Sequence, residues 1–150
     1  MKSYEVIIEE YQESRHTNRY QVCPGITQIV MDAREKGLRQ AVVSNNPTKE
    51  IELILGNVGL GGLFDFVVGN DVRTEGGELR KKPAPDTYLF AARQLGIASS
   101  QCVVIEDSLI GAAAGKAAGC FVVGVATGGA TMKELGELGN KIDKVYQSFM

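Results

Sequence analysis

The feature that most constrains this chain is a short apolar run that ends in two adjacent acids and leads at once into a helical pattern. The run Cys-Val-Val-Ile occupies residues 102–105, Glu106 and Asp107 follow, and small residues at helical spacing fill 109–119. Such a run is typical of a buried parallel strand. Ligands of open α/β sheets bind at the carboxyl ends of the strands. The two acids therefore indicate a site for a hard cation such as Mg²⁺, and an ordinary helix cap formed by Asp107 or Ser108 is the structural alternative.

Strand and helix patterns alternate along the rest of the chain through short connections. We expect further strands over residues 38–43, 64–68, 121–125 and 144–146. We expect further helices over residues 26–36, 47–55, 88–95 and 132–138. The alternation predicts a parallel sheet with right-handed crossovers. The expected fold class is therefore α/β, with a Rossmann-like parallel sheet flanked by helices.

Composition and charge exclude several classes of protein. The 150 residues carry 16 basic and 18 acidic side chains, intermixed along the chain, for a net charge of −2, so we expect no nucleic-acid partner and no membrane partner. Three widely spaced cysteines do not form a disulfide framework. No signal peptide and no long apolar segment is present, which predicts a cytoplasmic protein. His16 is the only histidine, which argues against a histidine-based metal site or histidine catalysis.

Two further segments carry polar groups that suit an anion. Ser44 and Asn45 follow the strand expected over 38–43, where a hydroxyl and the backbone N–H groups of a helix N-terminus form a natural anion site. A plain capping turn is the alternative there. Lys82 stands in a proline-flanked turn before a helix, where it would pair with a phosphate or remain a solvated lysine. We expect these residues to share one edge of the sheet with the acid pair.

Three segments together resemble the haloacid dehalogenase-like superfamily: Val42-Val43-Ser44-Asn45, Lys82-Pro83-Ala84-Pro85-Asp86 and Val104-Ile105-Glu106-Asp107-Ser108. Their form is similar to the phosphoglycolate phosphatase and β-phosphoglucomutase branch, and the similarity runs from about Pro24 to the C-terminus. The resemblance implies a phosphate contact at Ser44 and a charge-balancing role for Lys82. It also implies Mg²⁺ ligation by Asp107 with help from Glu106.

The same resemblance shows that one element is missing. The family begins with a strand that ends in Asp-x-Asp, whose first aspartate is the nucleophile and whose second is the general acid/base. No Asp-x-Asp precedes Ser44 in this chain. Without that attacking carboxylate, the remaining residues bind charge but have no group that forms a covalent intermediate.

The N-terminal residues have a helical rather than a strand-like spacing. Apolar side chains recur three and four residues apart at Tyr4, Ile7, Ile8 and Tyr11, which predicts an N-terminal helix. We interpret residues 1–23 as a remnant of the family's helical cap with its linker, and residues 24–150 as the α/β core without its nucleophile strand. The alternative lays residues 6–11 over the missing strand, with Glu9 at the nucleophile position, and fits this spacing less well.

A sheet that lacks its central strand would leave backbone groups unpaired. Three arrangements would satisfy them: the two neighbouring strands pair directly, the N-terminal segment fills the gap, or a second copy of the chain covers it. The last arrangement predicts a homo-oligomer.

Two functional hypotheses follow. The first is a truncated hydrolase core without phosphatase activity of its own, which keeps a phosphate and Mg²⁺ pocket formed by Ser44, Asn45, Lys82, Glu106 and Asp107. The alternative is a Mg²⁺-dependent phosphatase or phosphomutase-like hydrolase that acts on a small phosphorylated metabolite and takes its nucleophile from upstream sequence or from a partner chain. A nucleotide-binding Rossmann module is disfavoured, because no Gly-x-Gly-x-x-Gly follows a first strand.

Overall fold

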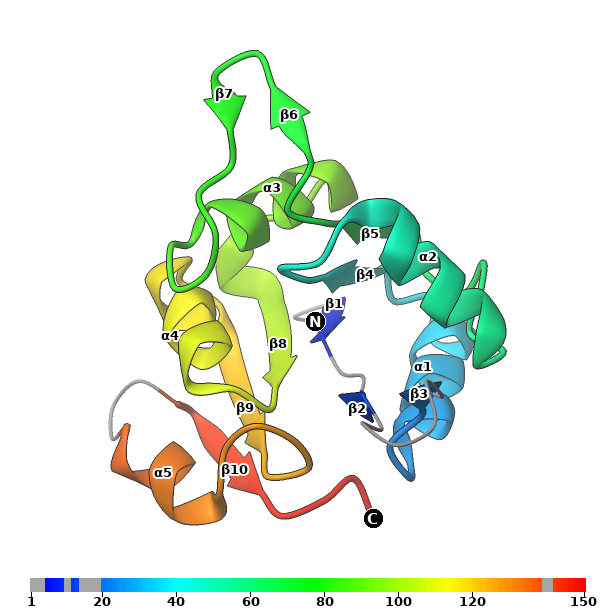
Figure 1. Cartoon of the computed structure of the whole chain (residues 1–150). Coiled ribbons are helices and arrows are strands. Elements are labelled where there is room, and N and C mark those ends of the chain that lie inside the picture. The colour runs from blue at the N-terminus through cyan, green and yellow to red at the C-terminus, as the bar shows by residue number, and fades with distance from the viewer. Residues whose placement is uncertain (1–4, 10–11, 14–19, 139–141) are drawn as a thin grey trace.

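A computed structural model describes residues 5–9, 12–13, 20–138 and 142–150. Its main strands are β1 (Glu5–Glu9), β4 (Gln40–Val43), β5 (Phe66–Val68), β8 (Cys102–Glu106), β9 (Phe121–Val125) and β10 (Lys144–Tyr146). They form one six-stranded sheet in the order β10-β9-β8-β1-β4-β5, and every pair of neighbours is parallel. Helices lie on both faces of this sheet (Figure 1). The predicted α/β, Rossmann-like fold class is confirmed.

The helices fall at the segments expected for them, with ends that differ by a few residues. They are α1 (Ile26–Glu35), α2 (Thr48–Asn57), α3 (Asp86–Leu95), α4 (Leu109–Ala117) and α5 (Met132–Glu137), with a short 3-10 turn at Ser99–Gln101. Two small antiparallel pairs were not predicted: β2 (Gln12–Glu13) with β3 (Tyr20–Gln21), and β6 (Arg73–Thr74) with β7 (Gly77–Glu78). The second pair is a hairpin that projects from the body of the molecule (Figure 1).

The N-terminal segment forms the strand β1, so the prediction of a helix there is wrong for residues 5–9. Ile7 lies opposite Ala41 of β4 and opposite Val104 of β8. The physical reason is that β1 completes the backbone hydrogen bonds of two neighbours at once, a gain that local spacing does not reveal. The segment Val6-Ile7-Ile8 is also a continuous β-branched run, and β-branched residues favour strands.

The gap expected in the centre of the sheet is therefore filled. Of the three arrangements considered for it, the structure shows the second, in which the N-terminal segment lies between β8 and β4. Tyr4 and Tyr11 of the predicted helix, and also His16, lie outside the described residues.

The core has two layers, one on each face of the sheet. On one face, α3 and α4 pack on β4, β5, β8 and β9 around Tyr88, Leu95, Val104 and Val122. On the other face, α1 packs through Ile26 and Val30 on β8 and β9. The small residues of α4 let it lie close to the sheet, because a Cβ at Gly115 would come within 2.9 Å of the Val122 side chain. Among the described residues, no helix has the length and apolar character to cross a membrane.

Candidate functional site

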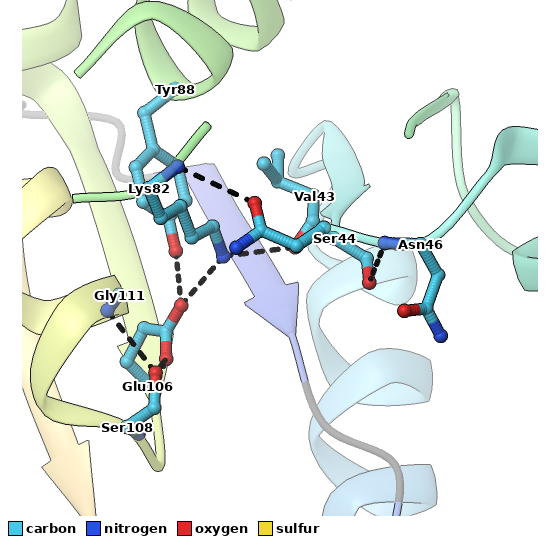
Figure 2. A network of polar contacts seen from close by, with 9 residues as sticks. Val43, Ser44, Asn46, Lys82, Tyr88, Glu106, Ser108 and Gly111 are labelled. Atoms are coloured by element: carbon cyan, nitrogen blue, oxygen red, sulfur yellow. Dashed lines mark hydrogen bonds and ion pairs between the residues drawn. The ribbon is translucent and has the colours of Figure 1, made fainter. Parts of the chain in front are cut away.

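A buried ion pair lies where β4 and β8 end. Lys82, in the turn before α3, places its Nζ 2.7 Å from Oε1 of Glu106, the last residue of β8. The two side chains are 1% and 0% exposed. Lys82 Nζ also donates to the carbonyl oxygen of Val43, the last residue of β4, at 3.1 Å (Figure 2). The alternative of a solvated lysine is therefore wrong for Lys82.

Burial and charge act in opposite directions on Lys82. Burial lowers its pKa, because a low-dielectric surrounding disfavours the ammonium form, and the negative charge of Glu106 opposes that fall. A buried charge of this kind needs a partner in direct contact, since an unpaired one costs several kcal/mol. Glu106 is that partner.

The carboxylate of Glu106 is held by groups on both of its oxygens. Besides Lys82, Oε1 accepts a hydrogen bond from the hydroxyl of Tyr88. Oε2 accepts from the Oγ and the backbone N of Ser108, at 2.9 and 3.3 Å. At Gly111, an added Cβ would overlap the carboxylate itself. Glu106 is thus held inside the protein by these partners, and the help it would give Asp107 in Mg²⁺ ligation, which the resemblance implies, remains a prediction.

Sequence reasoning missed Tyr88 and Gly111 as parts of this cluster. In the sequence, Tyr88 is the first residue of the helix expected over 88–95, and nothing near it in the sequence indicates that its phenol contacts a carboxylate. Burial raises the pKa of Tyr88 well above its ordinary value of 10.0, and the charge of Glu106 adds to the rise. The hydroxyl therefore keeps its proton and acts as the donor to Glu106.

Ser108 caps helix α4, as the structural alternative at this position predicted. Its Oγ accepts a hydrogen bond from the backbone N of Gly111 at 3.1 Å. The same hydroxyl donates to Glu106. The side chain of Ser108 thus caps the N-terminus of α4 and also holds the carboxylate of Glu106.

The turn after β4 brings Ser44 and Asn45 beside Lys82. Ser44 is buried, and its Oγ accepts from the backbone N of Asn46 at 3.2 Å, which is the geometry of a local turn. Asn45 Oδ1 accepts from the backbone N of Lys82 at 3.4 Å. The turn therefore fixes the backbone around Lys82, while an anion contact at Ser44 or Asn45 remains a prediction.

The N-terminus of α2 already has a carboxylate beside it. Oδ1 of Asp71 accepts from the backbone N and from the Oγ1 of Thr48, at 2.8 and 2.7 Å. These hydrogen bonds, led by the one from the Thr48 side chain, lower the pKa of Asp71. An anion bound near Ser44 would meet this negative charge, so Lys82 is the group in the cluster that favours an anion most directly.

Asp107 lies beside the cluster, half-buried, and is not part of the ion pair. Burial raises its pKa, the charge of Glu106 raises it further, and a hydrogen bond from the backbone of Gly129 opposes the rise. The loop after β9 packs against this residue: a Cβ at Gly128 would overlap the carboxylate, and Ala130 N donates to the backbone oxygen of Asp107 at 2.9 Å. A cation nearby would relieve the cost of this charge.

The described side chains do not by themselves complete a Mg²⁺ site. Among the residues that the structure describes, no three His, Cys, Asp or Glu side chains lie close enough to hold one ion. Glu106 has its oxygens occupied by Lys82, Tyr88 and Ser108, which leaves Asp107 as the one carboxylate of the predicted pair that is open to a cation.

The carboxyl end of β1 reaches the same place. Glu9, its last residue, is the register partner of Glu106 in β8. Glu10 and Tyr11 follow in the sequence. Glu9 therefore lies at the position where the resemblance implies the nucleophile. This agrees with the alternative that placed residues 6–11 on the missing strand, which the helical spacing disfavoured.

Comparison with known proteins identifies the family of the chain. A family model described as haloacid dehalogenase-like hydrolase matches residues 3–119, which include β1 as well as the three motifs. The chain therefore belongs to the haloacid dehalogenase-like hydrolases.

Its curated relatives include phosphatases. The chain is 33% identical over 117 residues to phosphoglycolate phosphatase of Colwellia psychrerythraea and 32% identical over 116 residues to hexitol phosphatase A of Escherichia coli, with 73% and 77% of this chain covered. It is also 33% identical over 136 residues to the chloroplastic protein SUPPRESSOR OF QUENCHING 1 of Arabidopsis thaliana, with 89% of this chain covered. It spans 50%, 51% and 12% of these three relatives, respectively.

Solved structures share the fold. CbbY from Rhodobacter sphaeroides in complex with phosphate matches with a TM-score of 0.74 at 28% identity, and a family hydrolase from Deinococcus radiodurans with bound phosphate and sodium matches with a TM-score of 0.75 at 35% identity. Each match covers 87% of this chain and 56% of the other.

Proposed function

We propose that this chain binds the phosphoryl group of a small phosphorylated metabolite at the carboxyl edge of its sheet and hydrolyses phosphomonoesters slowly or not at all. The observation that carries the proposal is the register of β1, which aligns Glu9 with Glu106. A glutamate thus stands where the resemblance implies the nucleophilic aspartate, and Tyr11 stands where it implies the acid/base. Attack in line on phosphorus depends on placing the reacting atoms to within about 1 Å, and the longer glutamate side chain changes that placement.

The binding half of the proposal rests on Lys82. Its ammonium lies at the ends of β4 and β8, buried from solvent, where a charge attracts an anion more strongly than it does in bulk solvent. The two solved relatives with bound phosphate support the ligand class.

We expect a metal ion to bind at this site only weakly. We propose that Mg²⁺ binds at Asp107, because its carboxylate is the open one of the acid pair. The ion would offset the negative charge that burial makes costly there. Since no group of three His, Cys, Asp or Glu side chains that could hold a metal ion is found among the described residues, we expect weak binding of Mg²⁺ that Asp107→Asn abolishes.

The second candidate function is a Mg²⁺-dependent phosphatase. The alternative considered from the sequence took the nucleophile from upstream sequence or a partner chain. β1 already lies between β8 and β4, so the candidate nucleophile is now Glu9 of this chain.

Hydrolysis of p-nitrophenyl phosphate separates the two functions. We expect the wild-type protein with Mg²⁺ to show almost no turnover, and the double variant Glu9→Asp/Tyr11→Asp, which installs Asp-x-Asp, to gain it. Glu9→Gln is the matched control and stays inactive. Robust Mg²⁺-dependent turnover by the wild-type protein that Glu9→Gln removes would establish the phosphatase instead.

A cytoplasmic location remains a prediction. The sequence predicted self-association because of a gap in the sheet. Since β1 fills that gap in the described sheet, we now propose a monomer.

A further inference from the structure

Tyr88 lies directly against the ion pair. It is fully buried in α3 and is among the largest fully buried side chains of the described residues. Its ring centroid lies 4.6 Å from Lys82 Nζ. Figure 2 shows the ring beside the lysine side chain and the hydroxyl directed at Glu106. The contact of a cation with an aromatic face is favourable, and more so where water is excluded.

The hydroxyl of Tyr88 and the ammonium of Lys82 bind the same carboxylate oxygen. Both donate to Oε1 of Glu106, while Ser108 donates to Oε2. Two donors on one oxygen and two from Ser108 on the other fix the rotation of the carboxylate. The carboxylate in turn fixes Lys82, whose Nζ also reaches the carbonyl of Val43.

We propose that Tyr88 is a positioning residue for phosphate binding: its hydroxyl holds Glu106, and its ring supports Lys82, so that the ammonium keeps one orientation. The expected effect on phosphate affinity rests on the proposed function. The expected effect on the orientation of Lys82 does not. Tyr88 touches no ligand and acts only through Glu106 and Lys82.

The variant Tyr88→Phe isolates the hydroxyl. Phenylalanine keeps the ring under Lys82, so the packing of α3 on the sheet is retained. Oε1 of Glu106 then loses one of its two donors, and only Lys82 and Ser108 still restrain the rotation of the carboxylate. We expect phosphate affinity to fall about tenfold, which is the size expected for a lost hydrogen bond to a charged group.

The test compares Tyr88→Phe with Tyr146→Phe in the full chain. Tyr146 lies in β10, is 49% exposed and takes no part in the cluster, so it is a matched control. Two quantities are measured for each protein: the affinity for inorganic phosphate by ³¹P NMR titration, and the exchange rate of the Lys82 Nζ protons with water, by NMR of protein that carries ¹⁵N-labelled lysine. The Lys82 signal is identified by its contacts to the ring at position 88.

The inference is supported if Tyr88→Phe weakens phosphate binding about tenfold and speeds exchange of the Nζ protons, while Tyr146→Phe changes neither. It is overturned if Tyr88→Phe leaves the Nζ exchange rate unchanged. If the wild-type protein binds no phosphate, the proposed function fails, and the Nζ exchange rate alone decides the role of Tyr88.

A measurement on the wild-type protein covers the case in which Tyr88→Phe does not fold. The hydroxyl proton of Tyr88 should exchange with water far more slowly than that of Tyr146, because it is held between two buried side chains. Equal exchange rates for the two hydroxyl protons would contradict the inference.

Discussion

At the scale of single residues, the site is built around one buried carboxylate and the residues that make room for it. Glu106 is fully buried and accepts hydrogen bonds from Lys82, Tyr88 and Ser108. Gly111 lies in the first turn of α4, where a larger residue would improve the helix but would occupy the space of this carboxylate. Steric fit to Glu106, more than helix propensity, therefore explains the glycine.

This explanation predicts that Gly111→Ala destabilises the protein by about 1–3 kcal/mol, the usual cost of overpacking. Gly136→Ala in α5 is the matched control, because nothing lies within 4 Å of its added Cβ. There alanine should be neutral or should stabilise the helix by up to about 1 kcal/mol. Urea unfolding measures both variants. Equal effects at the two positions would show that Glu106 does not fill the space beside Gly111.

Asp107 gives a prediction about pH. Its carboxyl has a raised pKa in the folded protein because of burial first and Glu106 second. Below the ordinary pKa of 3.8, the carboxyl is protonated in the folded and the unfolded protein, so it does not change the free energy of unfolding. As the pH rises through the raised pKa, the folded protein loses stability, because the carboxyl must then ionise in a buried place. Asp107→Asn should therefore raise the free energy of unfolding, and the gain should be larger at neutral pH than near 3.8.

Asp86→Asn is a control for which we expect the opposite change in the free energy of unfolding. Hydrogen bonds from Arg80, at 2.7–3.2 Å, lower the pKa of Asp86. Its carboxylate contributes stability above the ordinary value of 3.8, and this contribution is lost as the pH falls through the lowered value. Asp86→Asn should thus lower stability at neutral pH. Chemical denaturation across a pH series checks both signs, and a loss of stability in Asp107→Asn would contradict the environment assigned to that residue.

At the scale of elements, the position of β1 decides what the site contains. The strand ends beside β8, with Glu9 in register with Glu106. Parallel neighbours satisfy the backbone of β1 on both sides. One short strand therefore completes the sheet and also sets which residue stands at the nucleophile position.

At the scale of the whole molecule, β1 makes the six strands one continuous sheet, which would otherwise have two further edges. Deletion of residues 1–9 would expose the facing edges of β4 and β8, and exposed edges of this kind pair with other chains. We expect the intact chain to sediment as a monomer of 16.1 kDa and the deletion variant to self-associate. Sedimentation velocity at micromolar concentration checks this, and an intact chain that dimerises as readily as the variant would contradict it.

The sequence by itself determined the elements and the motif positions. The alternation of apolar runs and helical stripes predicted all the main strands and helices from residue 26 onwards, because each pattern depends on neighbours within a few residues. The same holds for Ser44, Asn45, Lys82, Glu106 and Asp107, which stand at strand ends or in a turn that the sequence makes visible.

Only the tertiary structure decided that residues 5–9 form a strand and which side chains surround Glu106. The N-terminal segment has helical spacing, yet it forms a strand because β4 and β8 offer it backbone partners far away in the sequence. Tyr88 and Gly111 join the site for the same reason, since their contacts with Glu106 arise from how α3 and α4 pack on the sheet. Contacts of this kind are non-local, and a pattern confined to one segment carries no information about them.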